Sequence, residues 1–189
     1  MSNYKPLYDS IWSDVDFQEY TVSKKLLYIY LITNKFTEKS GIYKITVRQM
    51  SFDTGIEKDL INDLINEFIN DGKLKYDAKN GIMFVKNIYK FHKGLIKNKN
   101  ILLLTLKRSY ELINTDFWQD LFDLYPNDET LKIFINEVIN GSLMAHQLYI
   151  NTSKNKGKSK SSNKSKAADN HNKEESAFFL KLKNLGVDA

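Results

Sequence analysis

The stretch from Thr46 to Val85 constrains the fold most, because it predicts several elements in a fixed order. Residues 46–54 fit a short helix, and Gly55 follows as the residue that best tolerates the left-handed conformation at a helix end. Residues 57–70 fit a second helix. Its apolar side chains repeat at helical spacing and predict one buried stripe: Leu60, Ile61, Leu64, Ile65, Phe68 and Ile69.

A two-stranded hairpin is predicted after this helix, which Asp71 and Gly72 end. Residues 73–77 alternate like a strand, residues 78–81 supply an Asn-Gly turn, and residues 82–86 return. Helix, turn, helix and hairpin in this order is typical of a winged helix-turn-helix, which most often binds nucleic acid. The same order also fits an α+β core without a ligand.

The residues before this stretch complete the pattern. Residues 1–20 suggest a short turn or helix that packs its aromatic side chains on the next part of the chain. Residues 22–33 fit a helix capped by Thr21 or Ser23, and its apolar side chains on every face predict a central buried helix. Residues 42–45 fit a short strand that would pair with the hairpin. We therefore expect an α+β, mostly helical fold built on a winged helix.

Several segments resemble the N-terminal domain of phage and prophage replication initiators, the replisome organisers, which are distantly similar to DnaD-type primosome proteins. The resemblance covers residues 10–93 and rests on Trp12–Asp14, Lys25–Asn34, Gly41–Ile45, Phe52–Gly55, Asp71–Tyr76 and Val85–Asn87. It implies a winged helix that binds double-stranded origin DNA in the cytoplasm of a bacterial host and recruits a helicase or a helicase loader. The rest of the chain does not match the usual C-terminal halves of that family.

Four regions are expected along the chain. Residues 1–94 form the DNA-binding domain, and Gly94 ends it. Residues 95–150 carry helices over about 95–114, 116–125 and 129–140, the last capped by Asn127 or Asp128. These helices are too few for a large core, so they either dock on the first domain or make a homodimer.

The last two regions differ sharply in composition. Residues 151–173 are rich in Lys, Ser and Asn and predict a disordered linker, because they cannot bury enough apolar surface to offset the entropy of ordering. Residues 174–189 predict a short amphipathic segment that docks on a partner. Its apolar side chains are the expected contacts: Phe178, Phe179, Leu182 and Leu185.

The net charge of +5 is distributed unevenly. Residues 57–71 hold five acids and one lysine, whereas residues 73–108 hold nine lysines and one arginine against a single acid. Residues 111–140 are acidic again, and residues 154–166 carry six lysines and no acid. A polyanion would therefore be attracted to the hairpin, the segment after it and the tail.

The second helix of the motif would present Lys58, Asn62 and Asn66 to the major groove, where the two amides could pair with adenine. Its acids oppose binding. Either only the first turn enters the groove, through residues 56, 57, 58 and 62, or the hairpin does most of the binding; we prefer the first. Residues of the preceding helix would fix the DNA backbone: Arg48, Gln49, Ser51 and Thr54.

The hairpin offers Lys73, Lys75, Lys79 and Asn80 for phosphate or minor-groove contact. A second basic strip comes after it, with Lys86, Lys90 and Lys93 interleaved with Tyr89, Phe91 and His92. Such strips can stack single-stranded bases, although aromatic residues at this spacing are more often part of a core.

Other functions are disfavoured. The chain has no cysteine, its three histidines are far apart, and no Gly-rich phosphate loop occurs, so we expect neither an enzyme nor a metal or cofactor site. No apolar run is long enough to span a membrane, which predicts a soluble cytoplasmic protein. Two rival functions are a winged-helix transcriptional repressor and a protein–protein adaptor whose acidic helix face binds a basic partner.

Overall fold

The computed structural model describes residues 5–96 and 98–140, which fall into two compact units divided between Tyr125 and Pro126. The first unit contains η1 (Asp9–Ser13), α1 (Val15–Glu19), α2 (Val22–Thr33), β1 (Ile42–Lys44), α3 (Val47–Thr54), α4 (Lys58–Asn70), β2 (Leu74–Asp77), β3 (Ile82–Val85), α5 (Ile88–Leu95), α6 (Lys99–Leu112) and α7 (Phe117–Leu124). The second unit contains α8 (Glu129–Phe134) and η2 (Ile135–Asn140). The described chain is α+β and mostly helical, as the sequence predicts.

Short polar side chains begin several of these helices. The Thr21 hydroxyl accepts a hydrogen bond from the third backbone amide of α2, and Thr46 does the same at the start of α3. The Asp128 carboxylate accepts two amides at the start of α8. Gly55 ends α3 with φ of 72°, in the left-handed region that the sequence predicts for it. The predicted bounds of α2, α3 and α4 are thereby confirmed to within a residue.

The sheet has three antiparallel strands in the order β1-β3-β2. The predicted hairpin is confirmed: Leu74 pairs with Val85, and Asp77 pairs with Ile82 next to the turn. Strand β3 is central and its side chains are buried on both faces. A short strand that is apolar throughout is the pattern expected when both faces of a sheet are covered.

One face of the sheet packs on α2, α3 and α4, where a single hydrophobic cluster forms around Met83, Tyr43 and Phe68. The prediction that α2 is buried on every face is wrong, because Val22 and Leu26 are exposed and only one side of the helix faces the cluster. Three tyrosines near or on α2 are only partly buried, so the helix lies at the edge of the core.

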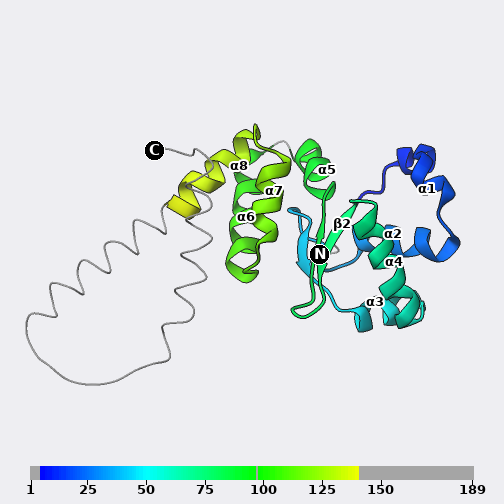
Figure 1. Ribbon diagram of the computed structural model, residues 1–189. Helices are drawn as coiled ribbons and strands as arrows, with labels where there is room; N and C mark the ends of the chain where they lie inside the picture. The colour runs from blue at the N-terminus through cyan, green and yellow to red at the C-terminus, as the bar shows by residue number, and fades with distance from the viewer. Residues whose placement is uncertain (1–4, 97, 141–189) are drawn as a thin grey trace, which may run out of the picture. The chain divides into compact units, whose positions relative to one another are not determined.

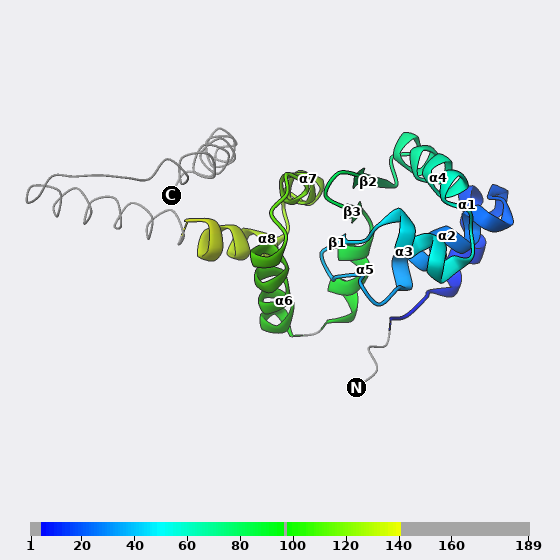
Figure 2. The same ribbon diagram turned by 90° about the horizontal axis from the view of Figure 1, so that it is seen from below.

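The other face of the sheet is covered by α6 and α7. The rings of Phe84 on β3 and Phe117 on α7 lie 6.3 Å apart, and the Ser109 hydroxyl of α6 lies 3.5 Å from a carboxylate oxygen of Glu38. Figures 1 and 2 both show the strands between α2, α3 and α4 on one side and α6 and α7 on the other. Both helices therefore pack on the sheet of the first unit, and the homodimer stays a prediction.

The segment after the hairpin differs from its prediction. Residues 88–95 form helix α5, and Gly94 lies inside this helix. The compact unit continues to Tyr125, whose ring lies 5.2 Å from that of Tyr89 and whose hydroxyl donates to the carbonyl of Lys86 at 3.1 Å. These long-range contacts tie α7 to the end of the hairpin. The predicted domain boundary at Gly94 would separate the residues that form these contacts.

Candidate nucleic-acid interface

The exposed face of α4 carries the side chains predicted to contact bases. Lys58, Asn62 and Asn66 are exposed, while the opposite face of the helix packs into the core. Ile56 is a correction to the prediction, because it is only 7% exposed and belongs to the hydrophobic cluster. It follows the turn at Gly55, and burial of its apolar side chain joins α3 to α4.

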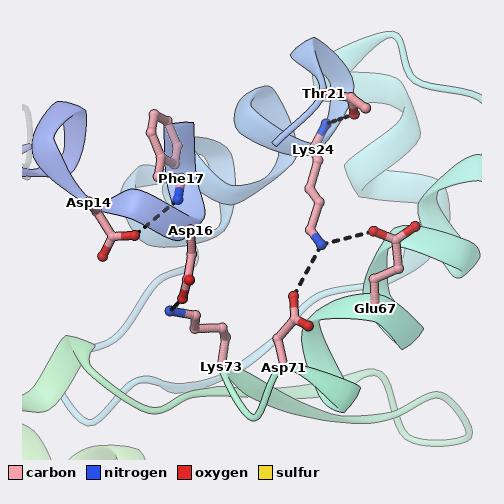
Figure 3. Close-up of polar contacts among 8 residues, drawn as sticks. All are labelled: Asp14, Asp16, Phe17, Thr21, Lys24, Glu67, Asp71 and Lys73. Atoms are coloured by element: carbon pink, nitrogen blue, oxygen red, sulfur yellow. Dashed lines mark hydrogen bonds and ion pairs between the residues drawn. The ribbon is translucent and has the colours of Figure 1, made fainter. Parts of the chain in front are cut away.

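The acids near the end of α4 are held by Lys24 of α2. The Lys24 ammonium donates to Glu67 at 2.8 Å and to Asp71 at 3.1 Å (Figure 3). It also lies 4.4 Å from the ring centre of Tyr20 and 5.1 Å from that of Phe68, within the range of cation–π attraction. Lys24 is therefore a structural cation, with a role that its sequence position alone does not reveal.

The charge on Lys24 is stabilised in this setting. Burial alone would lower the pKa of its ammonium, but the hydrogen bonds with Glu67 and Asp71 outweigh that effect and raise the pKa. Lys24 thereby offsets one of the two negative charges of Glu67 and Asp71, and the group keeps a net charge of −1. Its repulsion toward a phosphate backbone is reduced by about half.

The acids near the start of α4 have a different setting. Glu57 precedes the helix, Asp59 lies in its first turn, and Asp63 lies one turn later; all three are exposed. A helix N-terminus favours carboxylates within its first turn, which explains Glu57 and Asp59 but not Asp63. Lys58 is the one basic residue among them. The N-terminal half of α4 is the half expected to enter the groove. It therefore carries more net negative charge than the C-terminal half, whose acids are paired with Lys24.

Four side chains on α3 were predicted to contact the DNA backbone. Some of them are exposed to solvent, and others form hydrogen bonds within the protein. Arg48 is exposed and Ser51 is half-buried. The Gln49 amide donates to Asp53 at 2.9 Å, and the Thr54 hydroxyl donates to a backbone carbonyl of its own helix at 2.6 Å. Arg48 is thus the cation of α3 that faces solvent, whereas Gln49 and Thr54 also have structural roles.

Two of the predicted hairpin lysines form ion pairs within the unit. The Lys73 ammonium lies 2.6 Å from a carboxylate oxygen of Asp16 on α1, and Lys75 lies 2.6 Å from Asp120 on α7. Figure 3 shows the first pair, which joins α1 to the base of the hairpin. The hydrogen bond and the charge of Lys73 lower the pKa of Asp16, and the same bond raises the pKa of Lys73.

The hairpin turn itself is exposed. Lys79 and Asn80 lie at its tip, and the Asp77 carboxylate fixes the turn by accepting the backbone amides of both and the side-chain amide of Asn80. The carbonyl of Gly81 accepts the backbone amide that follows β1, so the exposed Lys44 lies beside the turn. Lys44 was not among the predicted site residues, although strand alternation could have placed it opposite the buried Tyr43.

The second predicted strip is divided between a turn and α5. Lys90 and Lys93 are exposed on α5, whereas Lys86 is half-buried in the turn before this helix. The aromatic residues do not share one environment, because Tyr89 is fully buried whereas Phe91 is 48% exposed. The prediction that these aromatic residues are core holds for Tyr89 alone.

The C-terminal contacts predicted at Phe178, Phe179, Leu182 and Leu185, and the linker before them, lie outside the described residues. None of the described helices is long and apolar enough to cross a membrane. Among the described residues, no three His, Asp or Glu side chains gather in a way that could hold a metal ion. No protein-family model matches the chain, and no curated protein or solved structure matches it either.

Proposed function

We propose that the first unit is a winged helix-turn-helix that binds double-stranded DNA. The strand order β1-β3-β2, with α3 and α4 inserted between β1 and β2, supports this assignment. The proposal rests chiefly on the exposed face of α4, with Lys58, Asn62 and Asn66, in a unit whose hairpin turn is also exposed. In this arrangement α4 lies in the major groove and the turn approaches the flanking backbone.

The proposed contacts fall into two groups. Asn62 and Asn66 pair with adenine edges, and each bidentate pair would contribute roughly 1–3 kcal/mol of discrimination. Lys79, Arg48 and Lys44 neutralise phosphates and position the duplex. The predicted roles of Lys73 and Lys75 change, because a phosphate would have to displace a carboxylate from each. They are assigned to holding α1 and α7 in place.

The process served by this binding is proposed to be phage-type replication initiation, with recruitment of a helicase or helicase loader through the C-terminal segment. The support is the sequence resemblance of residues 10–93 to replisome organisers. A transcriptional repressor is the alternative that would use the same interface. Deletion of residues 174–189 should abolish recruitment and leave DNA binding intact, whereas a repressor would show no effect on helicase loading.

A matched pair of lysines tests the interface. We expect Lys79→Ala to weaken DNA binding and to lower the slope of log affinity against log salt by about one, as for loss of one phosphate contact. Lys75→Ala should change the slope little, because its charge is already paired with Asp120. Fluorescence anisotropy with duplex DNA over a range of salt measures both. Equal effects of the two variants, or affinity that does not depend on salt, would contradict the proposed interface.

The exposed acids of α4 favour one further candidate, an adaptor that binds a basic protein. The double variant Asp59→Asn and Asp63→Asn distinguishes it from a DNA-binding protein. If α4 enters the groove, removal of two negative charges should raise duplex affinity several-fold at low salt, because exposed charges are little screened there. If α4 binds a basic partner, the variant should lose that partner and leave DNA binding unchanged.

A further inference from the structure

A cavity of about 150 Å³ lies at the base of the hairpin, away from the proposed duplex interface. It is enclosed by the N-terminal segment, α2, the first residues after β3, and α5. Lys73 lines it, whereas Lys79 lies at the hairpin tip. Six residues of extended chain span roughly 20 Å, so the cavity and the tip are separate sites.

The wall of the cavity is largely aromatic. Tyr8, Phe17, Tyr28 and Phe91 all line it; the rings of Tyr8 and Phe91 lie 5.4 Å apart, and those of Phe17 and Tyr28 lie 6.1 Å apart. Tyr8 and Phe91 are also partly exposed, which places them at the opening. An engineered protein cavity of about 150 Å³ holds one benzene molecule, so this volume suits a single ring.

The remaining wall is polar and sets the ligand apart from a plain hydrocarbon. Asn87, His92 and Lys73 line the cavity. The Lys73 ammonium is paired with Asp16, whereas Asn87 and His92 supply hydrogen-bonding groups at the wall. A ligand with polar atoms at its edge finds partners in these two side chains.

The surroundings of the cavity are basic, although Lys5, Lys39 and Lys90 do not line it. Lys90 precedes Phe91 and is exposed. Burial lowers the pKa of the His92 imidazole, and the nearby charges of Lys39 and Lys5 lower it further. The Lys5 ammonium itself donates to the carbonyls of Asn34 and Thr37. Asp14 is the acid that lines the cavity, and its carboxylate caps α1 by accepting the amide of Phe17 at 3.0 Å. The positive charge around His92 therefore favours an anionic ligand.

We propose that this cavity binds one unstacked nucleobase, with an adjoining phosphate near His92. A base has two apolar faces for the aromatic wall and hydrogen-bonding groups at its edge for the polar wall. The base could belong to single-stranded DNA or to a free nucleotide. The site is distinct from the proposed duplex interface and does not depend on it.

Binding of a short oligo(dT) to the full chain, measured by fluorescence anisotropy, tests the proposal. Phe91→Ala should weaken binding roughly 10-fold or more, because one stacked aromatic side chain is removed. Phe52→Ala is the matched control, since Phe52 is an exposed phenylalanine on α3 that does not line the cavity. An abasic oligonucleotide of equal length should bind more weakly, and thymidine monophosphate should compete if the base alone is recognised.

A conservative second variant keeps the test valid if Phe91→Ala unfolds the chain. Phe91→Leu keeps an apolar side chain, removes only the aromatic ring, and should weaken oligo(dT) binding roughly 3- to 10-fold through lost stacking. Competition by oligo(dT) but not by thymidine monophosphate would identify single-stranded DNA as the source of the base. The proposal is overturned if abasic and base-carrying oligonucleotides bind equally, or if Phe52→Ala weakens binding and Phe91→Leu does not.

Discussion

The two ends of α4 show how one helix can be structural at one end and open to a ligand at the other. At its C-terminal end, Glu67 and Asp71 are paired with Lys24, and the hairpin base after it is held by the pair of Lys73 with Asp16. At its N-terminal end, Lys58 and Asn62 are exposed. The end joined to the hairpin base is thus fixed by the protein, and the other end faces solvent.

This difference shows that charge counted along the sequence is a poor guide to the field that a ligand meets. Residues 57–71 sum to −4 and residues 73–108 to +9. In the structure, two of those acids and two of the hairpin lysines are paired within the unit. The difference in net charge that a polyanion meets between these two regions is therefore smaller than the sequence predicts.

The largest expected effect comes from the core at the fixed end of α4. Phe68 is fully buried, and its ring lies 5.6 Å from that of Tyr20 and 5.5 Å from that of Tyr28. Phe68→Ala should lower the free energy of unfolding by about 3–5 kcal/mol, through lost burial and a cavity. Phe52→Ala is the control: its side chain is 84% exposed, and we expect a change within about 0.5 kcal/mol. Urea denaturation measures both, and similar losses would contradict the packing described.

A smaller effect is expected from the cation that fixes the same end. Lys24→Gln should lower the free energy of unfolding by about 1–2 kcal/mol, because two carboxylates lose their partner while remaining partly exposed. The double variant Glu67→Gln and Asp71→Asn in the Lys24→Gln background should recover part of that loss. Additive losses in such a cycle would show that these groups do not interact in solution.

Local patterns predicted most of the fold. The apolar spacing of residues 57–70, the Asn-Gly turn and the polar residues before each helix are short-range signals, and they gave α2, α3, α4 and the hairpin nearly residue for residue. The helix α5 was missed because its alternating aromatic and basic residues also fit an extended strip. Tyr89 of this helix packs against Tyr125, which lies far along the chain, and local spacing does not reveal that contact.

The candidate site was harder to predict for a related reason. Types of residue can be read from the sequence, but their partners come from distant segments. Lys75 and Asp120 are 45 residues apart, and Lys24 and Glu67 are 43 apart. The aromatic cavity has the same origin, since Tyr8, Tyr28 and Phe91 come from three separate segments. Local spacing carries no signal for any of these contacts.

The smallest expected effect is a pH dependence of the pair at the hairpin base. The hydrogen bond and charge of Lys73 lower the pKa of Asp16 in the folded chain, whereas in the unfolded chain it returns to about 3.9. The folded state therefore binds this proton less readily. The stabilisation is present above about pH 4 and is lost as the pH falls through the lower, folded pKa.

Asp16→Asn should consequently lower the melting temperature slightly near neutral pH, and the gap from the parent chain should close below about pH 4. The effect is small because Asp16 is exposed, and salt should reduce it further. Asp63→Asn is the matched control, since that exposed carboxylate lies beyond the first turn of α4 and forms no ion pair with the described residues. A gap that persists unchanged into acid would show that Asp16 stabilises α1 without its charge. Lys73 would then be available to a phosphate, and the base of the hairpin would be as open as its tip.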